Sequence, residues 1–285
     1  MTYRTIVAYL PDADSAPRTL KAATIMARQS GAHLIGLYVK TGIRLYFAGS
    51  SYYDVGMLET LMEEHNARHN EQSTKVREMF DTISRAENFP CEFHVAETVK
   101  TDASEAVLEY ARPADLIVCP NGAGDKKTDP EDADVAVRMM LEAGRPVLVV
   151  PAGWNGDTLG RDITLAYNAS REATRAAFDA LPLLKQAEQV HAIWIDPVVG
   201  AGEDTSRAAD EIAVALARHG VKIAAETDAS GNNTIARAII ARARDNGSDM
   251  IVMGAYGHMR LREMIFGGTS RDMLDLLPLP VLMSH

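Results

Sequence analysis

Short apolar runs alternate with longer amphipathic stretches along the chain. In its second part the apolar runs cover 163–167, 190–195, 221–225, 250–253 and 281–283. The stretches between them carry helical patterns at 170–186, 204–219, 232–246 and 267–277. One helix face is marked by a 4,3,4 spacing of apolar residues at Ala173, Ala177, Ala180 and Leu184. Short apolar strands separated by helices predict a parallel sheet covered on both faces.

The first part of the chain shows the same alternation. Its apolar runs lie near 5–10, 33–39, 91–97, 115–119 and 146–150, and a helical pattern of unusual length covers about 57–87. We therefore expect an α/β protein made of two doubly wound, five-stranded units with parallel sheets.

The two parts are copies of one another. Ala114-Asp115-Leu116-Ile117-Val118 recurs 134 residues later as Ser248-Asp249-Met250-Ile251-Val252, and Pro146 recurs as Pro280 at the same separation. Near the starts, Ile6 matches Ile163 at a separation of 157, because the first copy carries an insertion of roughly twenty residues around 41–60. The repeat predicts domains at 1–152 and 158–285. The insertion is rich in aromatic residues, which suits a lid, an interface patch or packing onto its own domain.

Charge and cysteine content narrow the function classes. The chain of 285 residues has a net charge of −10, which disfavours non-specific binding to nucleic acid or to an anionic membrane. No apolar run approaches the ~20 residues of a membrane span, and the N-terminus does not read as a secretory signal.

Cys91 and Cys119 belong to no metal or disulfide pattern, so we expect inert thiols and a cytoplasmic location. His65 and His69 have a metal-capable spacing but no third ligand, so we expect them on an exposed helix face.

Glycines and cations after the fourth strand of the second copy favour phosphate binding. Gly254 and Gly257 flank a turn, nine residues follow, and Gly267 and Gly268 open a helix. Glycines let the backbone approach an anion, and the free N–H groups of a helix N-terminus point at it. Hydroxyls and positive charge are supplied nearby by Thr269, Ser270, His258, Arg260, Arg262 and Arg271. The alternative is a strand-to-helix turn whose glycines serve only the backbone.

The spacing Gly254-x-x-Gly257, nine residues, Gly267 resembles the nucleotide-binding signature of the universal stress protein superfamily. The resemblance covers nearly the whole chain and implies a Rossmann-like strand order of 3-2-1-4-5. It implies binding of ATP or AMP, with or without Mg²⁺, by Ala166, Tyr167, Asn168, Ile195, Met253, Gly254, Gly257, His258, Arg260, Gly267, Gly268, Thr269 and Ser270. The chain departs from the family at Asn168, where members commonly have Asp, and at Gly268, where they have Ser or Thr.

The first copy has lost this motif. Pro120 and Ala123 stand at the positions of Gly254 and Gly257, and Ala133 replaces Gly267. Carboxylates in the intervening loop would repel phosphate. The sequence therefore predicts at most one nucleotide per chain, in the second domain.

With the features above, the resemblance implies a stress-response regulatory protein that binds an adenine nucleotide. Its mechanism would be ligand-linked ordering of the loop 257–268, which changes a surface seen by an unknown protein partner. We expect no catalytic residues and no metal ligands, since the P-loop, dinucleotide and Ser/His/Asp patterns are absent. A weak ATPase and an interaction module without a nucleotide remain as alternatives. The two copies would form an intramolecular pseudo-dimer, with a homodimer as a further option.

Overall fold

A computed structural model describes residues 2–43, 55–122, 132–197, 207–256 and 268–285. The first half contains β1 (Thr5–Tyr9), α1 (Ala16–Ser30), β2 (His33–Lys40), α2 (Val55–Ser84), β3 (Cys91–Glu97), α3 (Ser104–Ala111), β4 (Leu116–Pro120), α4 (Asp132–Glu142) and β5 (Val147–Val150). The second contains β6 (Asp162–Ala166), α5 (Arg171–Asp179), α6 (Leu181–Leu184), β7 (Gln189–Ile195), α7 (Ala208–Ala217), β8 (Ile223–Asp228), α8 (Ile235–Asp245), β9 (Met250–Gly254), α9 (Gly268–Leu276) and β10 (Val281–Ser284).

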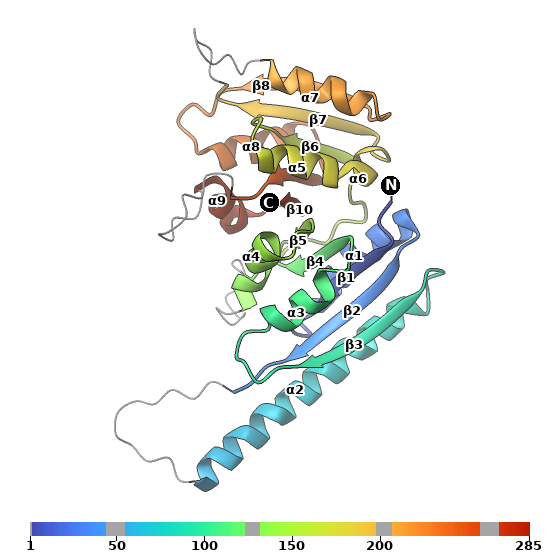
Figure 1. Cartoon of the computed structure of the whole chain (residues 1–285), viewed down its shortest axis with the longest axis vertical. Coiled ribbons are helices and arrows are strands. Elements are labelled where there is room, and N and C mark those ends of the chain that lie inside the picture. The colour runs from blue at the N-terminus through green and yellow to red at the C-terminus, as the bar shows by residue number, and fades with distance from the viewer. Residues whose placement is uncertain (1, 44–54, 123–131, 198–206, 257–267) are drawn as a thin grey trace.

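All ten strands form one sheet, in the order β3-β2-β1-β4-β5-β10-β9-β6-β7-β8 (Figure 1). If the strands of each half are numbered one to five and read from the outer edge of the sheet inward, both halves have the order 3-2-1-4-5. The neighbouring strands inside each half are parallel. The predicted fold class is therefore confirmed. The structure adds that the two halves join edge to edge, because β5 and β10 pair antiparallel with Leu148 opposite Leu282.

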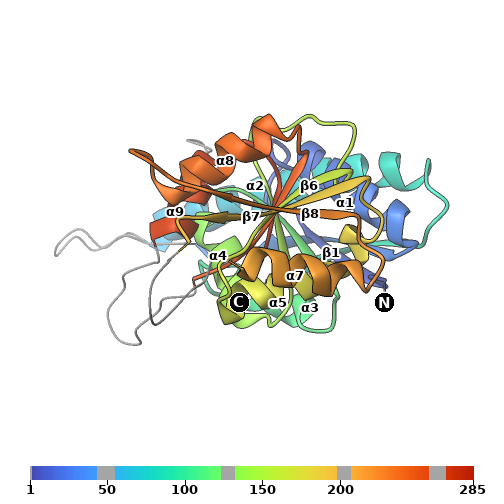
Figure 2. The same ribbon diagram turned by 90° about the horizontal axis from the view of Figure 1, so that it is seen from above.

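Helices cover both faces of this twisted sheet (Figure 2). Buried residues of α1, α2, α5, α6 and α7 share one apolar cluster, and those of α3, α4, α8 and α9 share the other. Each cluster continues from one half into the other. Successive side chains of a strand point to opposite faces of the sheet, so each strand contributes to both clusters. In β9, for example, Val252 belongs to the first cluster and Met253 to the second.

The aspartates that open the repeated motif have a structural task. Asp115 accepts hydrogen bonds from the backbone N–H groups of Arg4 and Thr5, at 2.7 and 3.1 Å. Asp249 accepts in the same way from Gly160 and Arg161, at 2.9 and 3.0 Å. In each half the aspartate before the fourth strand thus fixes the backbone that enters the first strand.

Two local predictions need correction. The helix expected over 170–186 is divided into α5 and α6, because Pro182 stands in the first turn of α6 and donates no N–H. His65 and His69 are half-buried rather than exposed: His65 Nε2 bonds the Thr41 carbonyl at 2.8 Å, and His69 Nδ1 bonds the Tyr38 hydroxyl at 2.8 Å.

Among the described residues, no helix is both long and apolar enough to cross a membrane. Cys119 is buried and Cys91 is partly buried, and both are free thiols. The aromatic residues of the insertion around 41–60, which include Tyr46, Phe47, Tyr52 and Tyr53, lie outside the described residues.

Candidate functional site

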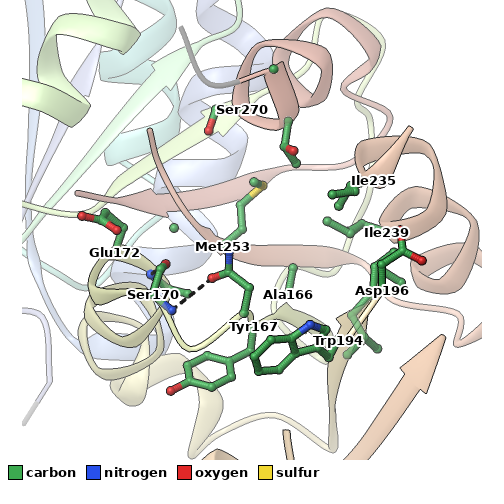
Figure 3. Close-up of a pocket in the computed structure, with 17 residues that line it drawn as sticks. Ala166, Tyr167, Ser170, Glu172, Trp194, Asp196, Ile235, Ile239, Met253 and Ser270 are labelled. Carbon is green, nitrogen blue, oxygen red and sulfur yellow. Dashed lines mark hydrogen bonds between the residues drawn. The ribbon is translucent and has the colours of Figure 1, made fainter. Parts of the chain in front are cut away.

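A pocket of about 480 Å³ lies at the carboxyl ends of β6, β7 and β9 in the second half. Its walls are completed by the first turns of three helices, α5, α8 and α9 (Figure 3). β6 lies between β7 and β9, so the strand order reverses at this point. Ligands of open parallel sheets collect at such switch points, and the pocket therefore occupies the favoured place for one.

The pocket brings together nine of the predicted site residues: Ala166, Tyr167, Asn168, Ile195, Met253, Gly254, Gly268, Thr269 and Ser270. The other four, Gly257, His258, Arg260 and Gly267, lie outside the described residues. The lining also contains residues that the motif does not indicate: Ser170, Glu172, Ala173, Ile193, Trp194, Asp196, Ile235 and Ile239. One sequence signal marks part of this second set, since Thr234 is a good helix N-cap and places Ile235 at the start of α8.

Aromatic and aliphatic side chains form an apolar part of the pocket. The rings of Tyr167 and Trp194 meet edge to face, with centroids 6.3 Å apart. Ile235 and Ile239 project from α8, and in Figure 3 Met253 lies between the aromatic pair and α9. Such surfaces suit a flat, largely apolar ring system.

Polar groups at the opposite side come from the beginnings of α5 and α9. Asn168 accepts a hydrogen bond from the Ser170 N–H at 3.3 Å, and Ser170 caps α5 by accepting from the Ala173 N–H at 3.1 Å. On α9, the Ser270 hydroxyl accepts from the Tyr256 N–H at 3.0 Å. A hydroxyl that accepts in this way still has its own proton to donate. Ser270 therefore both fixes the end of β9 to α9 and retains a donor for a ligand.

Backbone strain is concentrated around this pocket. Within the described part of the chain, the non-glycine residues with positive φ are Ala169, Asp196 and Tyr256, at 54°, 54° and 56°. Ala169 separates two lining residues, Asp196 lines the pocket, and Tyr256 follows Gly254 by two positions. Left-handed backbone is unfavourable for residues with a side chain and gathers at functional sites, so its position supports a ligand-binding role.

The charges in the described lining are both negative. Glu172 stands in the first turn of α5, and Asp196 follows β7 directly. Asp196 accepts from the backbone N–H and the hydroxyl of Ser230, at 2.9 and 2.5 Å, and these bonds hold its pKa below the usual range. No Lys, Arg or His belongs to the lining as far as the structure describes it. Attraction for an anion among these residues therefore comes from the helix N-termini.

Gly254 has a packing role that needs no ligand. A Cβ atom at this position would lie 2.5 Å from the Ala173 nitrogen and 2.6 Å from the Glu172 carbonyl carbon. Both are backbone atoms of the first turn of α5, so they cannot rotate away. Gly254 lets α5 approach the end of β9, whereas a Cβ on Gly268 would meet no atom of the described residues within 4 Å.

In the first half, the corresponding strand ends are filled by buried side chains. Leu10 aligns with Tyr167 and is fully buried, and Asn121 aligns with Ala255 and is 5 % exposed. The Asn121 amide donates to the carbonyl of Leu274 in the second half, at 2.8 Å.

Comparison with known proteins finds a family match in the second half. Residues 161–285 match the Universal stress protein family. A segment of 45 residues is 40 % identical to Universal stress protein Slr1230 of Synechocystis sp. (strain ATCC 27184 / PCC 6803 / Kazusa), and the match spans 16 % of each chain.

Solved structures extend the likeness to the whole chain. A universal stress protein from Archaeoglobus fulgidus DSM 4304 has a TM-score of 0.69 at 16 % identity, over 98 % of this chain and 97 % of that one. The functionally unknown protein PA1789 from Pseudomonas aeruginosa PAO1 has a TM-score of 0.59 at 17 % identity, over 99 % and 92 %. At these identities the likeness establishes the fold of both halves and no more.

Proposed function

We propose that the half of the chain that matches the Universal stress protein family, residues 161–285, binds an adenine nucleotide, ATP or AMP. One observation carries the proposal: the starts of α5, α8 and α9 converge on one pocket that has an apolar wall and a polar wall. Helix N-termini attract phosphate, and the volume of about 480 Å³ lies within the range of small-molecule sites.

In the proposed complex the base lies against the apolar wall, and the phosphates face α9. Trp194, Ile195 and Ile235 would contact the base. Thr269 and Ser270 would donate to the phosphates, together with the N–H groups at the start of α9. His258 and Arg260 are proposed to add positive charge. The bound nucleotide would regulate the binding of a protein partner, as the sequence predicts.

Isothermal titration of the full chain with ATP and with AMP, each with and without Mg²⁺, tests the proposal. We expect saturable binding of one nucleotide per chain. Absence of saturable binding of both nucleotides at millimolar concentration would show that the proposal is wrong and favour the interaction-module alternative. Release of phosphate above that of a protein-free control would favour the ATPase alternative.

A matched pair of variants locates the site. Ile235 is 41 % exposed and lines the pocket, whereas Val214 is 53 % exposed on α7 and does not line it. Ile235→Glu places a carboxylate in the apolar wall and should weaken binding at least tenfold, since a desolvated charge beside the base costs more than 1.4 kcal/mol. Val214→Glu makes the same chemical change on the same half and should leave the affinity unchanged. Equal behaviour of the two variants would place the nucleotide elsewhere.

A further inference from the structure

Two of the helices that form the pocket end at carbonyl groups that proline leaves without their usual partner. In α9 the N–H four residues beyond Leu274 would belong to Pro278, which has none. In α5 the residue three beyond Asp179 is Pro182, and the next N–H, of Leu183, is bonded to the Ala180 carbonyl at 2.9 Å. Both carbonyls therefore need a donor from outside their helix.

The first half supplies a donor to each of these carbonyls. The Asn121 side chain donates to the Leu274 carbonyl at 2.8 Å, and the Tyr3 hydroxyl donates to the Asp179 carbonyl at 2.8 Å. The two donors are almost completely buried, Asn121 at 5 % and Tyr3 at 4 % exposed. Burial raises the pKa of Tyr3, so its hydroxyl keeps the proton that it donates.

The repeat shows that these two bonds have no counterpart in the opposite direction. The residue that aligns with Asn121 is Ala255, and the residue that aligns with Tyr3 is Gly160. Neither has a side chain that can donate a hydrogen bond. One exposed contact does run the other way, from Arg175 Nη2 to the Gly144 carbonyl at 3.0 Å. The buried pair, however, is directed from the half that lost the glycine motif to the half that keeps it.

We propose that the first half of the chain positions the pocket of the second, with Tyr3 and Asn121 as the positioning residues. Each fixes the far end of a helix whose first turn lines the pocket. On α9 the bond from Asn121 lies close to the pocket, because Ser270 is only four residues before Leu274. The Ser270 hydroxyl accepts a hydrogen bond from the Tyr256 N–H at 3.0 Å. Loss of either donor frees the helix end, and the pocket then has to be ordered when a ligand binds.

The first test measures affinity and rests on the proposed nucleotide function. Tyr3→Phe and Asn121→Ala each remove one donor from the full chain. We expect each variant to raise the Kd for ATP about 3- to 10-fold, as the loss of one buried hydrogen bond predicts, and the double variant to raise it further. Gln29→Ala is the matched control, because Gln29 Nε2 also donates between the halves, to the Leu159 carbonyl at 2.9 Å, but Leu159 is not in a pocket helix. Parent-like affinity in the double variant would overturn the proposal.

The second test needs no ligand. Hydrogen exchange of the Tyr256 amide reports on the Tyr256–Ser270 bond at the pocket end of α9. Asn121→Ala should speed exchange of this amide, and Gln29→Ala should not. If faster exchange in Asn121→Ala is confined to the last turn of α9, the effect does not reach the pocket and the proposal is wrong. If ATP and AMP do not bind to the parent chain, the proposed function fails, and this exchange measurement alone decides the positioning role.

Discussion

Gly254→Ala separates the packing role of this glycine from any role in ligand binding. The added Cβ would lie 2.5, 2.6 and 2.9 Å from three backbone atoms of Glu172 and Ala173. Ordinary van der Waals contact begins at about 3.4 Å, so the first turn of α5 would have to move by several tenths of an ångström or more. The Ser170 cap depends on the same Ala173 nitrogen, at 3.1 Å, and would be disturbed by this movement.

The cost follows from these two effects. Overpacking a rigid contact costs about 1–3 kcal/mol, and a lost N-cap costs about 1 kcal/mol. We therefore expect Gly254→Ala to lower the free energy of unfolding by about 2–4 kcal/mol in the absence of any ligand. Gly268→Ala is the control, because among the residues that the structure describes its Cβ would meet no atom within 4 Å. That variant should change the free energy of unfolding by less than about 1 kcal/mol.

Urea unfolding of the two variants and the parent, followed by circular dichroism and by tryptophan fluorescence, measures this difference. The slope of the free energy of unfolding against urea concentration should be the same in all three proteins, so that differences in the urea midpoint report differences in stability. If Gly254→Ala is as stable as the parent and only nucleotide binding is lost, the packing argument is refuted, and the glycine is required by the ligand instead.

Three further predictions concern charge and titration. Glu172→Gln should raise the affinity for ATP relative to AMP about 3- to 10-fold by titration calorimetry, because ATP carries about two more negative charges. An unchanged ratio would contradict this, and it is the result expected for the control Glu211→Gln, since Glu211 lies on α7 and does not line the pocket. Burial lowers the pKa of His69 to about 4, with help from nearby His65, so the unfolded chain binds a proton that the native chain does not. Stability should therefore fall as the pH drops from about 6.5 to about 4, and His69→Gln should flatten that fall in urea titrations. Burial raises the pKa of Cys119 to about 12, so this thiol should resist a disulfide reagent at pH 7 until the protein unfolds, and rapid labelling in the native state would contradict its burial.

Much of the fold could be predicted because its determinants are local and repeated. The apolar runs of each half become strands, and the separation of 134 residues between Asp115 and Asp249 aligns β4 with β9. The pairing of β5 with β10 could not be predicted in this way. Both strands are short apolar segments at the edge of a five-stranded unit, and no pattern within either segment indicates which strand it pairs with.

The sequence indicates those residues of the pocket lining that belong to a motif. Spacing points to Gly254 and Ser270, although the structure gives each a packing or backbone contact that spacing does not show. Trp194 and Asp196 were missed, because a residue at the end of an apolar strand looks like core until the strand order is known. The contact between Asn121 and Leu274 joins positions 153 residues apart. This contact can be predicted only when the edge-to-edge arrangement of the two halves is already known.

The pairing of β5 with β10 also has a consequence for how this protein can evolve. When two identical chains assemble, every substitution appears on both sides of the assembly, so a change that closes one pocket closes both. Here the two sides are encoded separately, so a substitution in one half is not repeated at the equivalent position of the other. Pro120 and Asn121 stand in one copy where Gly254 and Ala255 stand in the other. Joining the halves in one chain therefore permits the two copies to diverge, so that one keeps the glycine motif and the other does not.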